Sequence, residues 1–174
     1  MEYFDVVNEE DNIIGKASRD ECHKKGLLHR TVHIFLLNSK GELLLQKRST
    51  KKNLYKGWWA DATAGHVDSG ETYDNAAKRE MKEEIGISTK LEKLFDVKRK
   101  WDGDGKVGNE LIRVYLCHSN GPFKINKEEI DFVRFVKPKD VLKMMKTEKF
   151  TPGTVAAFEE IKKHPDILKR LGLE

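Results

Sequence analysis

A helix-forming segment with one apolar side and one acidic side constrains the fold of this chain more than any other feature. Residues 71–85 consist largely of strong helix formers, and Gly86 follows where such a helix would end. Apolar residues recur every four positions from Tyr73 to Ile85. The sequence therefore predicts a helix over Glu71–Ile85 that packs its apolar side against another layer of the fold.

Three carboxylates crowd the acidic side of this predicted helix. Glu80, Glu83 and Glu84 stand at i, i+3 and i+4, so they share one helix face. Such crowding is unfavourable without a cation, and clustered hard oxygen ligands suit Mg²⁺ or Mn²⁺. Taken alone, an acidic run of this kind is also typical of a solvated helix surface. The flanking residues distinguish a metal site from such a surface.

The flanking residues complete a known pattern between Gly65 and Ile87. The pattern is G-x5-E-x7-R-E-U-x-E-E-x-G-U, in which U is a bulky apolar residue. Its seven glycine or polar positions are filled by Gly65, Glu71, Arg79, Glu80, Glu83, Glu84 and Gly86. The segment closely resembles the metal-binding motif of the Nudix family.

This resemblance implies a Nudix fold and a metal-dependent hydrolase that cleaves a diphosphate bond in a nucleoside diphosphate derivative or a related organic diphosphate. The implied metal ligands are the Gly65 carbonyl oxygen and the carboxylates of Glu80, Glu83 and Glu84. Arg79 is expected to pair with Glu71 and hold the loop, and Glu83 or Glu84 doubles as the base. Divalent metal polarises the phosphoryl group and lowers the pKa of an attacking water.

A second resemblance, to isopentenyl-diphosphate isomerases, covers roughly residues 1–145. It is carried by Phe4–Asn8, Leu43–Arg48 and Gly57–Trp59. That branch holds a further metal with histidines and a glutamate pair, and the residues here that match it are His23, His29, His66 and Glu110. Gly108 stands where the other glutamate is expected, which weakens the site. Taken singly, His23 or His29 is more typical of an ordinary turn or helix-surface position than of a metal ligand, and only the joint match with His66 makes the two interpretations equal.

The same branch places diphosphate-binding side chains at positions that are basic here. The candidate substrate-binding residues are Arg19, Arg48, Lys52 and Trp58. Basic side chains suit an anionic diphosphate, although an ordinary surface charge is the preferred interpretation for Lys52. An indole stacks on a base or covers an apolar tail, and core packing is the alternative for one of the neighbours Trp58 and Trp59.

Ala64 argues for hydrolysis and against isomerisation. The isomerases carry a catalytic cysteine two residues before the histidine that matches His66, and Ala64 has no thiol. The full glutamate set is what hydrolysis requires. Isopentenyl-diphosphate isomerase and a non-catalytic nucleotide-sensing Nudix domain remain the alternatives.

The remaining patterns predict an α/β fold with a mixed β-sheet sandwiched between α-helices, in one domain spanning residues 1–174. A hairpin occupies residues 1–18, and the last predicted helix covers about 152–163. The other predicted strands are 31–37, 42–47, 91–100, 111–118 and 130–136, and the other predicted helices are 19–25 and 138–145. Residues 51–68 are expected to be irregular, and 102–109 to form a mobile loop.

Charge and cysteine content indicate which partners and which cellular compartment to expect. The net charge of +4 is spread along the chain without long blocks, so nucleic-acid binding is not expected. Cys22 and Cys117 form no C-x-x-C pair, and no signal peptide or membrane-length apolar run is present. We expect a cytoplasmic protein with a small-molecule diphosphate substrate. A homodimer stays an open alternative.

Overall fold

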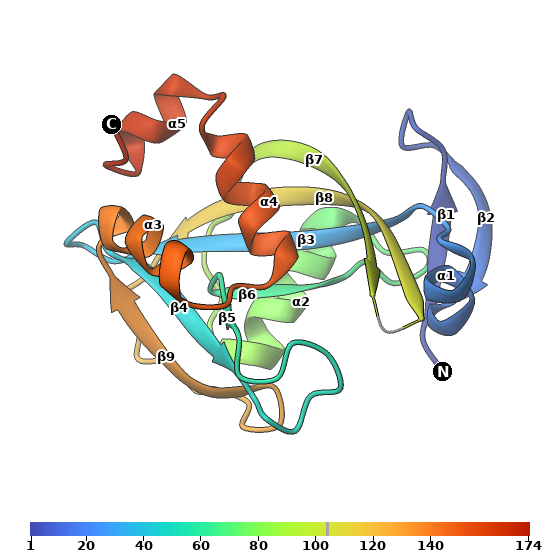
Figure 1. Ribbon diagram of the computed structural model, residues 1–174, viewed down its shortest axis with the longest axis horizontal. Helices are drawn as coiled ribbons and strands as arrows, with labels where there is room; N and C mark the ends of the chain where they lie inside the picture. The colour runs from blue at the N-terminus through green and yellow to red at the C-terminus, as the bar shows by residue number, and fades with distance from the viewer. Residues whose placement is uncertain (104) are drawn as a thin grey trace.

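The computed structural model describes residues 1–103 and 105–174. Within these residues, nine strands join one mixed sheet (Figure 1). The strands are β1 (Tyr3–Val7), β2 (Ile13–Ser18), β3 (His29–Leu37), β4 (Leu43–Arg48), β5 (Trp59–Ala60), β6 (Thr63–His66), β7 (Glu92–Gly103), β8 (Lys106–His118) and β9 (Ile130–Val136). The helices are α1 (Arg19–Lys25), α2 (Tyr73–Ile85), α3 (Pro138–Thr147), α4 (Pro152–Ile161) and α5 (Pro165–Arg170).

Strand β3 is the centre of the sheet. It pairs in parallel with β8 along its whole length, from His29 opposite Glu110 to Leu37 opposite His118. On its other side it pairs antiparallel with β6, and it also meets β1 near its start and β4 at its end. Parallel and antiparallel neighbours therefore meet on one strand, which confirms the predicted mixed sheet.

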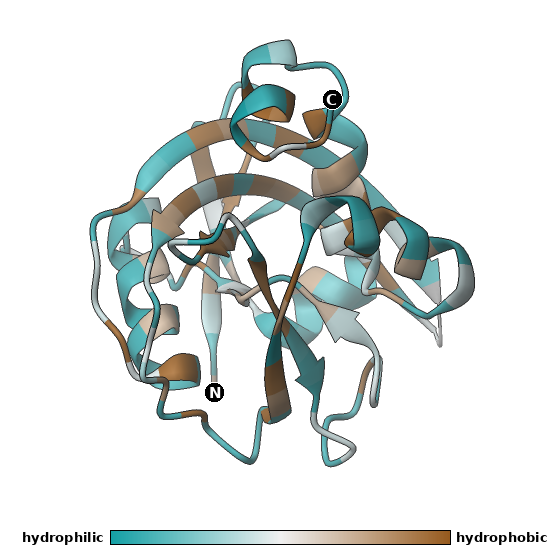
Figure 2. Ribbon diagram, turned by 90° about the vertical axis from the view of Figure 1, so that its left-hand side faces the viewer, coloured by the Kyte–Doolittle hydropathy of each residue, from teal (hydrophilic) through white to brown (hydrophobic). Residues whose placement is uncertain are grey.

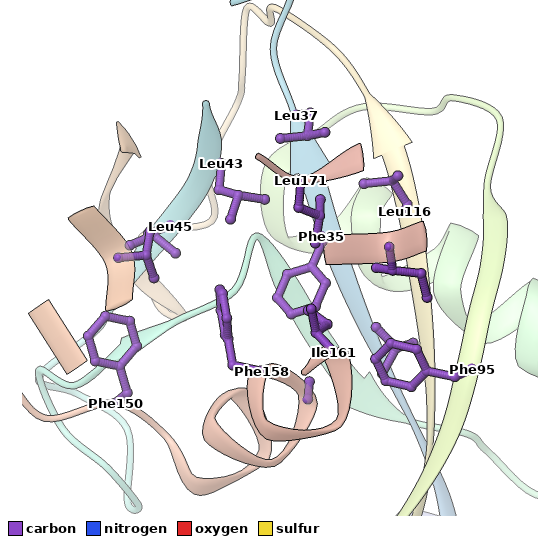
Figure 3. Packing of buried hydrophobic residues seen from close by; sticks show 14 of the residues in the cluster. Phe35, Leu37, Leu43, Leu45, Phe95, Leu116, Phe150, Phe158, Ile161 and Leu171 are labelled. Carbon is purple, nitrogen blue, oxygen red and sulfur yellow. The ribbon is translucent and has the colours of Figure 1, made fainter. Parts of the chain in front are cut away.

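Helices cover both faces of this sheet, as predicted. Successive side chains of a strand point to opposite faces, so Val32, Ile34 and Leu36 pack with the apolar side of α2. The alternating residues Phe35 and Leu37 pack into a second cluster on the other face. Residues of α3, α4 and α5 close that cluster, and Figure 3 shows Phe158 and Ile161 of α4 beside Phe35. Figure 2 shows the corresponding hydrophobic bands along the central strands.

Local capping sets the ends of the helices that frame the candidate site. The Ser18 side chain accepts a hydrogen bond from the Glu21 amide at the start of α1, and Gly26 ends that helix with φ of 63°. Helix α2 begins after Thr72, whose hydroxyl accepts from the Asn75 amide at 3.2 Å. The helix starts at Tyr73, two residues later than predicted, because Thr72 acts as its N-cap and accepts a hydrogen bond from an amide of the first turn.

Three expectations from sequence were wrong. Residues 102–109 are not a loop throughout, because β7 and β8 continue as an antiparallel hairpin in which Trp101 stands opposite Gly108. The indole lies over that glycine, which favours continued strand pairing. Asp104, part of the expected loop, lies outside the described residues. The expected irregular stretch 51–68 contains β5 and β6, and α5 follows α4 as a separate helix.

Among the described residues, no helix is both long and apolar enough to cross a membrane.

Candidate active site

A cavity of about 760 Å³ opens beside the central strands. It is reached by side chains from α1, β3, β4, β6, α2 and β8, and by the first turn of α4. The predicted site residues that line it are Arg19, His23, Arg48, Lys52, Gly65, His66, Arg79, Glu80, Glu83, Glu84 and Glu110. Glu71, His29 and Trp58 are not among the described lining residues. The fold thus brings most of the predicted site together.

Two of the three clustered carboxyls are largely buried at the wall of this cavity. The Glu84 carboxylate accepts hydrogen bonds from Gln46 Nε2 at 3.0 Å and from the Thr63 hydroxyl. Burial raises the pKa of Glu84 to about 7 despite these donors. Burial and then the charge of Glu84 raise the pKa of Glu80 to about 8, although Arg79 opposes the shift. Both carboxyl groups face one cavity, where burial disfavours their charged forms. A divalent cation bound between them would favour those charged forms.

Gly65 is required by the close approach of Glu80. A Cβ built on Gly65 would lie 2.1 Å from Glu80 Cδ, far inside contact distance. Strand β6 therefore presents bare backbone to the carboxyl group at this point. The glycine of the motif creates the space that Glu80 occupies.

Arg79 ties the loop before α2 to the carboxylate cluster. Its guanidinium donates to Glu71 from Nε at 3.1 Å and from Nη2 at 2.9 Å, and the latter also donates to the His66 carbonyl oxygen at 3.0 Å. Its Nη1 donates to Glu80 at 2.7 Å. This fork geometry needs several donors in one plane, which lysine does not provide. Arg79 thereby orients both the loop and one candidate ligand.

Three histidines from three elements form a second candidate metal centre. His23 of α1, His29 of β3 and His66 of β6 bring ring nitrogens within 4.8 Å of one another. Among the described residues, His23 Nδ1, His29 Nε2 and His66 Nε2 are buried without hydrogen-bond partners. Burial lowers the pKa of all three, so their rings are uncharged at neutral pH. Neutral imidazoles with free lone pairs are ready to ligate a metal.

Glu110 lies beside this cluster but is engaged elsewhere. It stands opposite His29 in the β3–β8 register, and its carboxylate accepts from Trp101 Nε1 at 3.1 Å. The Trp101 ring occupies the space over Gly108, where a Cβ would lie 1.8 Å from Nε1. An indole thus fills the position at which the isomerase-like pattern expects a second glutamate. The three histidines, without Glu110, form the cluster in this geometry.

The chain matches the family described as the NUDIX domain over residues 27–158, which include β3, β6, α2 and β8 of the cavity wall but not α1. The chain belongs to the Nudix family. An uncharacterized Nudix hydrolase of Pseudomonas aeruginosa is 33% identical over 157 residues, covering 87% of this chain and 88% of the relative. An isopentenyl-diphosphate Delta-isomerase of Aromatoleum aromaticum is 33% identical over 132 residues, covering 75% and 70%.

A solved structure supports the same fold. The crystal structure of a Deinococcus radiodurans protein aligns with a TM-score of 0.72 and 25% identity, covering 86% of this chain and 92% of that one. Together these matches make the chain a Nudix hydrolase acting on diphosphate bonds, with relatives in the isomerase-like branch.

Basic side chains outside α2 also line the cavity of this Nudix hydrolase. Arg19 is half exposed and pairs with Glu2 at 2.7 Å, whereas Lys52 pairs with Glu129. Arg48 is more buried, and its Nε has no hydrogen-bond partner among the described residues. Burial lowers the pKa of Arg48. Its unpartnered donor makes Arg48 better suited than Lys52 to bind an anionic group.

The aromatic wall of the cavity differs from the one expected. Tyr55 and Trp101 line the cavity, while Trp58 contacts Tyr55 with ring centroids 5.0 Å apart. Trp59 is buried in the core, which agrees with core packing for one member of the adjacent pair. The role of Trp58 in substrate binding stays a prediction.

Sequence reasoning did not identify Gln46 and Thr63, which hold Glu84 in place. The signal for Gln46 was a polar residue after the apolar run of 43–45 in a predicted strand. An unpaired amide there would be costly, so it had to face a polar partner. No local pattern distinguished Thr63 from the other small residues around it.

Replacing Arg79 with lysine is expected to weaken divalent-metal affinity about 10–100-fold, because the ligand Glu80 loses its orienting partner. Isothermal titration with Mn²⁺ measures the effect. Lys78→Arg on the neighbouring exposed position is the matched control and should leave affinity unchanged. Equal Mn²⁺ affinity in Arg79→Lys and wild type would show that Arg79 is not needed to orient the metal ligands.

The raised pKa values of Glu80 and Glu84 predict a pH dependence of stability. A carboxyl with a raised folded-state pKa contributes its stability fully below its ordinary value of 4.5 and loses it as pH rises through 7 to 8. The melting temperature of metal-free wild type should therefore fall relative to that of Glu84→Gln between about pH 5 and about pH 8. Mg²⁺ should raise the wild-type melting temperature more at the upper pH. A pH-independent difference between the two proteins would contradict this account.

Proposed function

We propose that this Nudix hydrolase uses Mg²⁺ or Mn²⁺ to cleave the diphosphate bond of a nucleoside diphosphate derivative or a related organic diphosphate. The observation that carries the proposal is the pair of buried carboxyls, Glu80 and Glu84, at the wall of a cavity that also presents arginine and lysine. The ligands would be the Gly65 carbonyl oxygen and the carboxylates of Glu80, Glu83 and Glu84. Metal bound there would stabilise the charge that develops on the phosphoryl oxygens.

Residues around the proposed metal site would supply the general base and bind the substrate phosphates. Glu83 is the most exposed of the three carboxylates, at 57% of its side chain, and its contact with Arg79 is long at 3.4 Å. It is therefore free to accept the proton of an attacking water. Arg48 binds the substrate phosphates, and Arg19 and Lys52 add positive charge at the cavity rim.

The cysteine arrangement disfavours the isomerase alternative. Ala64 lines the cavity where the isomerase-like pattern requires a thiol. Cys22 and Cys117 are both buried, and neither is among the described lining residues. Burial also raises the pKa of both thiols, which reduces their reactivity. Proton transfer to an isoprenoid by cysteine has no source in this cavity.

A panel of organic diphosphates tests the proposal. Pure protein would be incubated with ADP-ribose, nucleotide sugars and isopentenyl diphosphate, each with Mg²⁺ or Mn²⁺, and released phosphate groups and dimethylallyl diphosphate would be measured. We expect metal-dependent cleavage of at least one member and no dimethylallyl product. Dimethylallyl product would favour the isomerase, and binding without cleavage across the panel would favour the nucleotide sensor.

A further inference from the structure

A buried histidine–aspartate pair stands at the cavity wall outside the Nudix motif. His33 lies on β3 directly opposite Ala64 of β6, and only 7% of it is exposed. Its Nδ1 lies 3.0 Å and 3.1 Å from the two carboxylate oxygens of Asp61, which is fully buried. The carboxylate favours a proton on Nδ1, and Nε2 is the ring nitrogen that does not face Asp61.

The start of α4 holds this pair in place. The Thr154 hydroxyl donates to Asp61 Oδ1 at 2.5 Å and lies 3.2 Å from the Asp61 amide. The Thr151 hydroxyl contacts that of Thr154 at 2.8 Å. Asp61 therefore has little freedom to rotate, and the orientation of the His33 ring is determined in advance of any ligand.

Gly153 brings the His33 ring close to the first turn of α4. A Cβ on Gly153 would lie 2.6 Å from Cε1 and 2.7 Å from Nε2 of His33. Both residues line the cavity. Gly153 is the second residue of α4, and its lack of a side chain gives the ring room for this close approach. A side chain at Gly153 would displace the His33 ring from this position at the cavity wall.

Two further features mark this end of the cavity as a polar site. No hydrogen bond joins His33 Nε2 to any other described residue. Thr31, on the same face of β3 and also lining the cavity, has a buried hydroxyl without a partner in the described chain. Unpartnered buried polar groups are costly unless a ligand or water completes them. A hydrocarbon would leave both groups unsatisfied.

The local electrostatics favour negative charge. Burial opposes ionisation of His33, but the charge and hydrogen bond of Asp61 outweigh it, so the pKa of His33 is raised. The amides at the start of α4 add partial positive charge on the same side. When Nε2 carries a proton, it can donate to an anionic oxygen beside this helix start.

We propose that His33 Nε2 and the first turn of α4 form a subsite for an anionic oxygen of the substrate, carried by a phosphate or a carboxylate group. The proposal rests on the proposed function and narrows its substrate class. Ala64, opposite His33, directly precedes Gly65, and His33 lines the same cavity as Glu80, Glu83 and Glu84. The substrate would carry oxygen-rich anionic chemistry at this end in place of an isoprenoid chain.

Anion binding to the metal-free protein provides the test. The ¹⁵N resonance of His33 Nε2, assigned by its loss in His33→Asn, would be followed during titration with inorganic phosphate and, separately, with acetate. We expect a saturable shift with at least one of them, and the two titrations distinguish phosphate from carboxylate recognition. No shift with either anion would overturn the proposal.

Two variants separate binding from a structural role. Asparagine at position 33 can still donate to Asp61 but lacks Nε2, so His33→Asn should keep its melting temperature and lose about 10–100-fold in anion affinity. Gly153→Ala keeps His33 and blocks its approach, and should weaken binding similarly. His118→Asn, at an exposed position, is the control. Unchanged affinity in both site variants would contradict the proposal, whereas a failed hydrolysis panel would contradict only the proposed function.

Discussion

Replacing Glu84 with glutamine is expected to lower the rate of metal-dependent diphosphate hydrolysis about 1000-fold, while the fold remains intact. Glutamine keeps the volume and can still accept from Gln46 and Thr63, but it removes the charge that a divalent cation needs. Metal catalysis contributes several kcal/mol to the transition state, and each 1.36 kcal/mol corresponds to about tenfold in rate.

The measurement is the steady-state rate with the best substrate of the panel, together with thermal unfolding. Glu159→Gln is the matched control, because that residue is exposed on α4 and pairs with Lys162. We expect its rate to equal that of wild type. A Glu84→Gln variant with an unchanged rate would exclude Glu84 from the proposed metal site.

Replacing Gly65 with alanine is expected to reduce activity about 100-fold or more through displacement of one carboxyl group. The new methyl group would lie 2.1 Å from Glu80 Cδ, so the flexible Glu80 side chain must swing out of the site. A shift of about 1 Å in a positioned group can cost about 100-fold in rate. The backbone of β6 need not move, so the loss of stability should be small.

Gly15→Ala is the matched control for this substitution. Gly15 also lies in a strand, and a Cβ there would only meet Val6 Cβ at 4.0 Å. Activity and Mn²⁺ affinity should both fall in Gly65→Ala and stay constant in Gly15→Ala. If Gly65→Ala retains full metal affinity, the Glu80 carboxyl does not depend on the space that this glycine provides.

Much of the layered architecture followed from short-range patterns. A helix over Glu71–Ile85 and its apolar side were predicted from propensity and a four-residue repeat, and the observed helix covers Tyr73–Ile85. The limits of prediction appear where side chains from distant segments meet. The strand pairing of Trp101 with Gly108 depends on a ring covering a glycine across the sheet, so residues 102–109 resembled a loop in sequence.

In the candidate site, too, local patterns were predictable and contacts between distant segments were not. The clustering of Glu80, Glu83 and Glu84 is a property of one helix. The partners of Glu84 come from β4 and β6, and no local pattern connects Gln46 or Thr63 to it. Likewise, the His33–Asp61 pair was not recognised, because its members are 28 positions apart and neither belongs to the motif.

The sequence by itself determined the acidic helix and its motif, because helical spacing alone puts those carboxylates on one face. Membership of the Nudix family could be inferred from the same residues. Only the tertiary structure decided how buried Glu80 and Glu84 are, and that burial raises their pKa values. It also brought His23, His29 and His66 together and placed His33 beside the first turn of α4. These properties depend on pairing between strands and on packing of distant segments, which local sequence does not specify.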